Sequence, residues 1–288
     1  MMQPLAPLTG PAIPPDCLRA FGERIEAWFG LAHPKRNRET LERRFRAVSR
    51  AMGITDPRAL VETMESAGPG SPLFRAMAEL VPNRETSFFR DEEQLRSFFD
   101  ELQQRQPTGA SGPIRILSAG CSTGEEVYSL AMLFFENMHQ FWGRSIAVHG
   151  IDLSEKALER ARSGLYPPSA IAKSGAGPAD WQRRYFRRTK EGFIAKPFLR
   201  SAVSFRQANL IDEESLAGLG GFDAVICRNV LIYFDPPTLI ETVRRLLSLI
   251  RPGGILLLGH AESGFIAHLD HIRRRNGDHV WFVREEEM

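Results

Sequence analysis

The sequence predicts an α/β fold, in which an all-α domain precedes a mainly parallel sheet with helices on both faces. Hydrophobic residues recur at helical spacing up to about residue 106. From residue 114 onward, strand-like and helix-like segments alternate, which is typical of a parallel sheet. The stretch between these patterns, QPTGASGP at residues 106–113, has the composition of a linker. A chain of 288 residues is long enough for two domains.

The overall composition excludes several classes of protein. Charged residues make up 25% of the chain and the net charge is +2, which argues against disorder and against a general nucleic-acid binder. The three cysteines, Cys17, Cys121 and Cys227, lie far apart and form no CxxC pair. Neither a disulfide scaffold nor a zinc site is therefore expected, and a reducing cytoplasm is the simplest location. We expect no metal.

The first 15 residues are rich in proline and lack both the basic start and the apolar core of a signal peptide. We expect residues 1–15 to be a disordered leader. The longest apolar runs, such as residues 255–258, are too short to cross a bilayer, which needs about 20 residues. No membrane insertion is expected.

Residues 16–90 are expected to form a helical domain, and its clearest helix covers residues 40–52. The apolar stripe of this helix consists of Leu41, Phe45, Val48 and Met52. A second face is basic and consists of Arg43, Arg46 and Arg50, with Arg36 in phase before them. A solvated surface and a docking surface for an acidic partner both fit such a face.

The second domain is expected at residues 113–288, after a linker helix and loop at residues 91–112. The predicted strands are residues 114–119, 145–151, 222–227, 254–260 and 279–283. The predicted helices are residues 125–138, 155–163 and 236–250. Residues 166–200 break this alternation with glycine, proline and scattered aromatic residues, and predict an insertion.

The loop after the first predicted strand is the first candidate for a ligand site. Gly120 and Gly124 bracket it, and glycines allow a ligand to approach the backbone closely. The loop has neither the GxGxxG pattern nor the lysine of a P-loop. Glu125 and Glu126 at the helix start would repel a pyrophosphate and suit a cationic or hydroxyl-bearing ligand. A plain glycine turn with capping glutamates is the alternative.

Two further segments are candidates for the same ligand site. Asp152 ends the second predicted strand, where its carboxylate can accept both hydroxyls of a ribose. Alternatively, Asp152 or Ser154 caps the next helix. In the later run 207–210, Asn209 can hydrogen-bond an adenine edge and Leu210 can pack on its face, unless the run is an ordinary loop turn.

Three longer strings make the chain similar to the CheR family, the chemotaxis receptor glutamate methyltransferases. They are residues 118–132 (SAGCSTGEEVYSLAM), 227–234 (CRNVLIYF) and 259–263 (GHAES). The resemblance spans roughly residues 20–283. It implies a Rossmann-like class I methyltransferase sheet with a small β subdomain inserted at about 166–200. It also implies S-adenosylmethionine as cofactor, with S-adenosylhomocysteine as product.

The same resemblance implies roles for individual residues. Residues 85–91 (ETSFFRD) resemble the family's interdomain segment, so Thr86 and Arg90 would touch the methionine end of the cofactor. The family has Asn two places before that threonine, whereas this chain has Arg84, with Asn83 one place earlier. Tyr233 would lie beside the transferred methyl group. The full set of expected cofactor residues is Thr86, Arg90, Gly120, Glu125, Asp152, Asn209, Leu210, Arg228 and Asn229.

A glutamate carboxylate ordinarily has a pKa of about 4.3, so it is ionised at neutral pH and needs no general base. The enzyme has mainly to position this carboxylate. The resemblance implies that the hydroxyl of Tyr233 orients it, and Arg228 is a candidate to hold it. Arg228 alternatively pairs with an acid such as Asp235. Phe88 and Phe89 are expected in the core.

The implied partner is the cytoplasmic helical region of methyl-accepting chemoreceptors, docked on the N-terminal domain of a monomeric enzyme. Whether the insertion holds a receptor tail peptide stays open. Two alternative functions also stay open: methylation of another substrate, such as a small molecule or RNA, and cofactor binding without turnover. The presence of Arg84 where the family has Asn favours the second alternative, and the presence of the other site residues disfavours it.

Overall fold

The computed structural model describes residues 12–32, 38–83, 85–106, 111–265, 273–276 and 279–284. The chain divides into two compact units, residues 1–83 and 84–288, which are described separately below. This division comes earlier than the boundary expected at residue 90. Of the expected leader, residues 1–11 lie outside the described part, and the remainder already contributes to the first unit: Ile13 is buried and a helix begins at Pro15.

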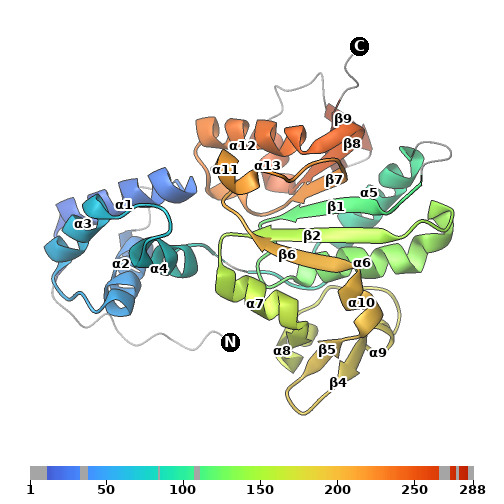
Figure 1. The fold of residues 1–288 in the computed structure, drawn as a ribbon, viewed down its shortest axis with the longest axis horizontal. Coiled ribbons are helices and arrows are strands. Elements are labelled where there is room, and N and C mark those ends of the chain that lie inside the picture. Colours follow the sequence, from blue (N-terminus) through green and yellow to red (C-terminus); the bar gives the residue numbers. More distant parts are fainter. Residues whose placement is uncertain are drawn as a thin grey trace. The chain divides into compact units, whose positions relative to one another are not determined.

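The first unit consists of four helices in its described part: α1 (Pro15–Phe29), α2 (Arg38–Met52), α3 (Pro57–Ser66) and α4 (Pro72–Leu80) (Figure 1). Two helix starts follow from the sequence, since Asp56 and Ser71 each accept a hydrogen bond from a first-turn amide and each precedes a proline. The predicted stripe on α2 is confirmed for Leu41, Phe45 and Val48, which are buried, whereas Met52 at the end of the helix is half-buried.

The second unit contains a seven-stranded sheet with the strand order β6-β2-β1-β7-β8-β10-β9 (Figure 1). These strands are β1 (Ile114–Ala119), β2 (Ile146–Asp152), β6 (Val203–Gln207), β7 (Phe222–Cys227), β8 (Ile250–Leu258), β9 (Arg273–Asn276) and β10 (His279–Val283). The pairs among β6, β2, β1, β7 and β8 are parallel, and β10 pairs antiparallel with β8 and β9. The predicted mainly parallel sheet is confirmed.

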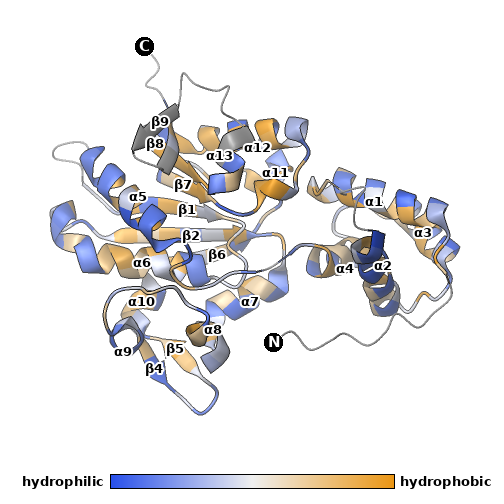
Figure 2. Cartoon of the chain, turned by 180° about the vertical axis from the view of Figure 1, so that it is seen from behind, coloured by the Kyte–Doolittle hydropathy of each residue, from blue (hydrophilic) through white to orange (hydrophobic). Residues whose placement is uncertain are grey.

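Hydrophobic clusters cover both faces of this sheet. On one face, α5 (Glu92–Gln104) and α6 (Glu125–Asn137) pack on Ile116 and Ala224. On the other face, α12 (Pro236–Ser248) packs on Leu117 and Val225. Two shorter helices are α7 (Glu155–Ser163) and α11 (Glu213–Leu216). Figure 2 shows the central strands in hydrophobic colours, as the burial of both their faces requires.

We expected residues 91–112 to form a linker helix and loop. The helix of this segment, α5, instead buries Leu95, Phe98, Phe99 and Leu102 in the core of the second unit. Its Gln94 Nε2 also donates a hydrogen bond to Leu258 O at 2.9 Å. Helix α5 is therefore an integral part of the second unit, because its apolar face is covered by the sheet and α6.

The range expected for the insertion forms a second, antiparallel sheet with the order β3-β5-β4. Its elements are β3 (Leu165–Tyr166), α8 (Pro168–Ala172), α9 (Trp181–Tyr185), β4 (Phe186–Arg188), β5 (Phe193–Ala195) and α10 (Pro197–Ser201). Tyr166, Trp181 and Phe186 are buried in the same hydrophobic cluster as α5 and α6. The insertion is thus continuous with the core of the second unit.

Candidate functional site

The loop between β1 and α6 turns sharply at the carboxyl end of β1. Gly120 has φ +81° and Gly124 has φ +89°, a region that glycine adopts without steric cost. A Cβ atom on Gly120 would lie 2.4 Å from Val230 Cγ2, so the position also has no room for a side chain. The amides of Gly120 and Cys121 both donate to Ile151 O, at 2.8 and 2.9 Å. This loop is therefore held against the end of β2.

Asp152 lies at that end of β2, as the sequence predicted. Its Oδ2 accepts a hydrogen bond from Ser122 N at 2.7 Å, and its Oδ1 accepts one from Ser154 N at 2.9 Å. The carboxylate therefore points toward the β1 loop and the start of the next helix. The helix cap is Ser154, whose Oγ accepts from Ala157 N at 3.0 Å. Of the two capping alternatives, the structure therefore supports the one for Ser154.

Glu125 is the first residue of α6 and is 4% exposed. Its Oε2 accepts a hydrogen bond from Thr123 Oγ1 at 2.6 Å. Burial raises the pKa of this carboxyl, and the hydrogen bond from Thr123 opposes the rise only partly. A cationic or hydroxyl-bearing ligand would stabilise the charged form of Glu125.

Asn209 and Leu210 follow β6, beside Asp152. Ala208 N donates to Asp152 O at 3.0 Å, which fixes this loop next to the end of β2. Leu210 is buried and Asn209 is half-buried. The Asn209 Oδ1 accepts a long hydrogen bond of 3.4 Å from Ile211 N. Gly120, Asp152 and the 208–210 loop are thus brought together at one edge of the sheet.

Arg228, directly after β7, is held by a dense buried network. Its side chain is 2% exposed and forms an ion pair with Glu126, Nε to Oε2, at 2.9 Å. The Nη1 donates to Gln94 Oε1 at 3.0 Å and the Nη2 donates to Arg90 O at 2.9 Å. The described partners of Arg228 are therefore Glu126, Asp91, Gln94 and the Arg90 backbone, which favours a role in positioning residues 90–94 over direct contact with a substrate.

Asn229 follows Arg228 in the left-handed backbone region, with φ +60°. Backbone strain in non-glycine residues clusters at functional sites. Three other described residues with positive φ lie in the same part of the unit: Phe89, Asp91 and Ser122. The turn continues into the short helix η2 (Leu231–Tyr233), which ends at the half-buried Tyr233.

Sequence reasoning assigned no role to Glu262, which supports this turn. Glu262 is in α13 (His260–Phe265), is fully buried and accepts a hydrogen bond from Val230 N at 3.0 Å. Burial raises the pKa of its carboxyl, although amides of the turn oppose the rise. A Cβ on Gly259 would lie 2.1 Å from Glu262 Oε2. The third family-like string, residues 259–263, was the available signal.

The segment 85–91 supplies Thr86 and Arg90, both half-buried. Phe88 and Phe89 are buried, as predicted, and Phe89 N donates to Ser129 Oγ of α6 at 2.9 Å. Because Arg228 binds Arg90 O, this segment also lies at the end of β7. Arg84, which stands where the family has Asn, lies outside the described residues.

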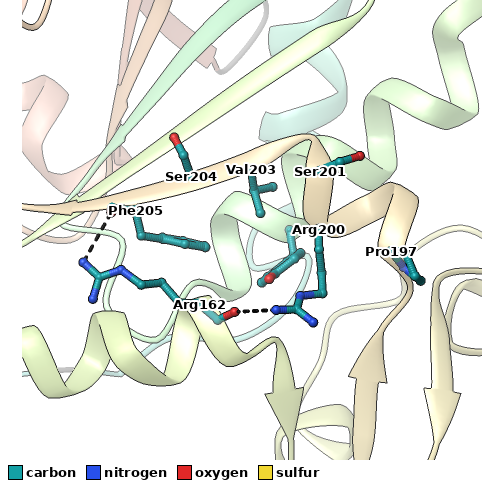
Figure 3. A pocket seen from close by; sticks show the side chains of 8 residues that line it. Arg162, Pro197, Arg200, Ser201, Val203, Ser204 and Phe205 are labelled. Carbon is teal, nitrogen blue, oxygen red and sulfur yellow. Dashed lines mark hydrogen bonds between the residues drawn. The ribbon is translucent and has the colours of Figure 1, made fainter.

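A pocket of about 440 Å³ lies elsewhere in the second unit (Figure 3). It is lined by Tyr128, Arg162, Pro197, Arg200, Ser201, Val203, Ser204 and Phe205. The first half of β6 contributes to it, whereas Asp152, Asn209 and Arg228 lie at or just after the carboxyl ends of their strands. None of the predicted site residues lines this pocket.

The predicted docking arginines belong to the first unit. Arg43 and Arg50 of α2 are exposed and Arg46 is half-buried. Among the described residues, no cluster of three or more His, Cys, Asp or Glu side chains could hold a metal ion. Within the same part of the chain, every helix is too short or too polar to span a membrane.

Comparison with known proteins gives a consistent result. The family model described as "CheR methyltransferase, SAM binding domain" matches residues 84–279. The chain is 32% identical over 271 residues to a chemotaxis protein methyltransferase of Escherichia coli, covering 93% of this chain and 91% of that protein.

A probable biofilm formation methyltransferase, WspC of Pseudomonas aeruginosa, is 37% identical over 201 residues, covering 69% of this chain. The chain spans 46% of the length of that relative. A solved S-adenosylmethionine-dependent methyltransferase from Thiobacillus denitrificans, in complex with S-adenosylhomocysteine, is 19% identical with a TM-score of 0.31. That match covers 64% of this chain and 52% of the other.

Proposed function

The chain belongs to the CheR methyltransferase family, and from that premise we propose that it methylates glutamate side chains of chemoreceptors. Its cofactor is S-adenosylmethionine. The product would be a glutamyl methyl ester, which serves sensory adaptation. The observation that carries the proposal is the convergence of the β1 loop, Asp152 and the Arg228–Tyr233 turn at one edge of the sheet.

The described residues fit this cofactor. Gly120, with φ +81° and no room for a side chain beside Val230, packs the β1 loop against the turn that follows β7. We assign the ribose hydroxyls to the Asp152 carboxylate, which lies beside the β1 loop, and a cationic or hydroxyl group of the cofactor to the buried Glu125 carboxylate. We assign adenine to Asn209 and Leu210, and the methionine end to Thr86 and Arg90. Asn229 completes this set.

When bound, S-adenosylmethionine supplies a methyl group that a nucleophile can attack in line with the carbon–sulfur bond, and S-adenosylhomocysteine is the leaving group. The chain's task is then to orient and partly desolvate a carboxylate that is already ionised. We assign the orienting role to the hydroxyl of Tyr233, at the end of the Asn229 turn. Arg228 acts through the backbone of Arg90 and through Gln94, which makes it a positioning residue.

The basic face of α2 is the candidate dock for the receptor. Arg43 and Arg50 are exposed and suit an acidic helical segment that carries glutamates. The name of the Escherichia coli relative, chemotaxis protein methyltransferase, supports a role in chemotaxis, and we place the reaction in the cytoplasm. Methylation of another substrate and cofactor binding without turnover are the alternatives, and the experiment below tests receptor methylation against both.

The test begins with calorimetric titration of the full chain with S-adenosylhomocysteine. Radiolabel transfer from S-adenosylmethionine to receptor cytoplasmic fragments then follows, with alkali treatment of the product. We expect binding and a base-labile label, because carboxyl methyl esters hydrolyse in alkali. Fragments with the acceptor glutamates changed to alanine are the control and should stay unlabelled.

Binding without label on any receptor fragment would refute the receptor substrate and keep the cofactor, as both alternatives predict. Alkali-stable label would indicate methylation of a different nucleophile.

A further inference from the structure

The insertion contacts residues 85–92, the stretch that carries Thr86 and Arg90, through direct hydrogen bonds. Gly175 N donates a hydrogen bond to Phe88 O at 2.8 Å, and Gly177 N donates one to Glu92 Oε2 at 2.6 Å. Phe88 lies between Thr86 and Arg90 in the sequence, and Glu92 follows two residues after Arg90. We call the stretch 175–177 the glycine turn. It lies between α8 and α9 of the insertion.

Neither glycine of this turn has room for a side chain. A Cβ on Gly175 would lie 2.3 Å from Phe89 O, a backbone atom. A Cβ on Gly177 would lie 2.7 and 2.8 Å from two carbons of the Phe89 ring. Gly177 also has φ +62°. The glycine turn is therefore fitted to the backbone and ring of Phe89.

Aromatic packing extends the same contact. The Trp181 ring of α9 lies 5.2 Å from the Phe88 ring and 5.0 Å from the Phe89 ring, measured between centroids. Phe88 also contacts Tyr166 of β3 at 4.8 Å. Aromatic side chains of the insertion therefore pack directly against Phe88 and Phe89 in the hydrophobic core.

The opposite side of the segment is held by the sheet and α6. Phe89 N donates to Ser129 Oγ, and Arg228 Nη2 donates to Arg90 O. Phe89 and Asp91 have φ +54° and +50°, so residues 89–91 adopt a backbone conformation that needs support from its surroundings. The support comes from two sides: Ser129 and Arg228 on one, the glycine turn on the other.

We propose that Gly175 and Gly177 are positioning residues for S-adenosylmethionine: the glycine turn fixes residues 88–92, and with them Thr86 and Arg90. The inference rests on the proposed roles of Thr86 and Arg90. Its consequence is that loss of the turn weakens cofactor binding from a distance, without removing any side chain that would touch the cofactor.

The main test compares Gly177→Ala with Gly143→Ala in the full chain. Gly143 has φ +75° and nothing within 4 Å of an added Cβ, so both changes impose a similar backbone strain. Only Gly177→Ala also displaces Phe89. We expect the affinity for S-adenosylhomocysteine, measured by calorimetry, to fall about tenfold or more in Gly177→Ala. In Gly143→Ala we expect less than about twofold.

A ligand-free readout separates this proposal from the proposed function. Amide hydrogen exchange in residues 85–92 should be faster in Gly177→Ala than in Gly143→Ala, with no cofactor present. Equal exchange and equal affinity in the two variants would refute the positioning role. Faster exchange together with unchanged affinity would refute only the assignment of Thr86 and Arg90 to the cofactor.

Glu92 provides a second pair of variants if Gly177→Ala does not fold. Glu92→Gln keeps an oxygen that can accept from Gly177 N, whereas Glu92→Ala removes it. We expect Glu92→Ala to raise KM for S-adenosylmethionine with a smaller change in kcat, and Glu92→Gln to restore KM. If both variants bind the cofactor like the wild type, the glycine turn does not act through Glu92 and the proposal fails.

Discussion

The two units bury different kinds of residue. In the described part of the first unit, no polar or charged residue is fully buried, and no non-glycine residue has positive φ. The second unit buries Glu125, Arg228 and Glu262 and contains every described non-glycine residue with positive φ. Buried charge and backbone strain both oppose folding. Their restriction to one unit indicates that the second unit performs the chemistry, while the first is stabilised mainly by apolar packing.

The largest effect is expected for Arg228→Ala in the second unit. It leaves the Glu126 carboxylate without its ion-pair partner and removes the support of residues 90–94, so the free energy of unfolding should fall by about 3–5 kcal/mol. Urea unfolding measures this. Arg244→Ala on the exposed surface of α12 is the control and should change stability by less than about 0.5 kcal/mol. A similar small loss in Arg228→Ala would contradict the network.

Tyr233→Phe should affect turnover without affecting stability. Loss of the hydroxyl misplaces the incoming carboxylate, so we expect kcat to fall about 100-fold. The affinity for S-adenosylhomocysteine, measured by calorimetry, should stay unchanged. An unchanged kcat would remove Tyr233 from the mechanism.

Val48→Ala tests the opposite behaviour in the first unit. Val48 is fully buried in α2, and loss of its methyl groups should cost about 2 kcal/mol of stability. Below the melting transition, kcat and cofactor affinity should equal those of the wild type. A loss of cofactor affinity in Val48→Ala would contradict the view that only the second unit determines cofactor binding.

Glu262→Gln should change the dependence of stability on pH. Burial raises the folded-state pKa of Glu262 above its unfolded value, so the wild type loses stability as pH rises through the folded pKa. Glutamine does not titrate and keeps an acceptor for Val230 N. The free energy of unfolding of the variant, relative to that of the wild type, should therefore increase as the pH rises from about 4. If the melting temperatures of the two proteins change in parallel as the pH rises from about 4, the pKa of Glu262 is not raised.

The smallest effect on the enzyme itself is expected for the double variant Arg43→Glu and Arg50→Glu. Both side chains are exposed, so stability should change by less than about 0.5 kcal/mol. Methylation of receptor fragments should instead show a raised KM that depends on salt concentration. Equal KM values at low salt would rule out this face as the dock.

The sequence predicted the features that depend on local pattern. The stripe on α2, the central strands and the helices on both faces follow from periodicity, and the core positions of Phe88 and Phe89 follow from their chemistry. Helix α5 was assigned to a linker because the nearby QPTGASGP stretch dominated that interpretation, although Leu95, Phe98 and Leu102 already had helical spacing.

The remaining features depend on contacts between residues far apart in the chain. Asp235 was a reasonable partner for Arg228 by proximity in sequence, but the observed partners Gln94 and Arg90 lie 134 and 138 residues away. The fit of Gly175 and Gly177 to Phe89 depends in the same way on how the insertion folds back. Periodicity carries no information on such pairs.

The glycine turn also limits how the insertion can be exchanged between relatives. Because the glycine turn fits closely against Phe89, the insertion cannot be replaced on its own by that of a relative. A chimera that replaces residues 164–200 must bring residues 85–92 from the same donor to keep the interface matched. Residues 177 and 89 are expected to covary among homologues, because a side chain gained at 177 needs a smaller ring or none at 89. Residue 175 should instead stay glycine, since its Cβ would meet the backbone oxygen of residue 89.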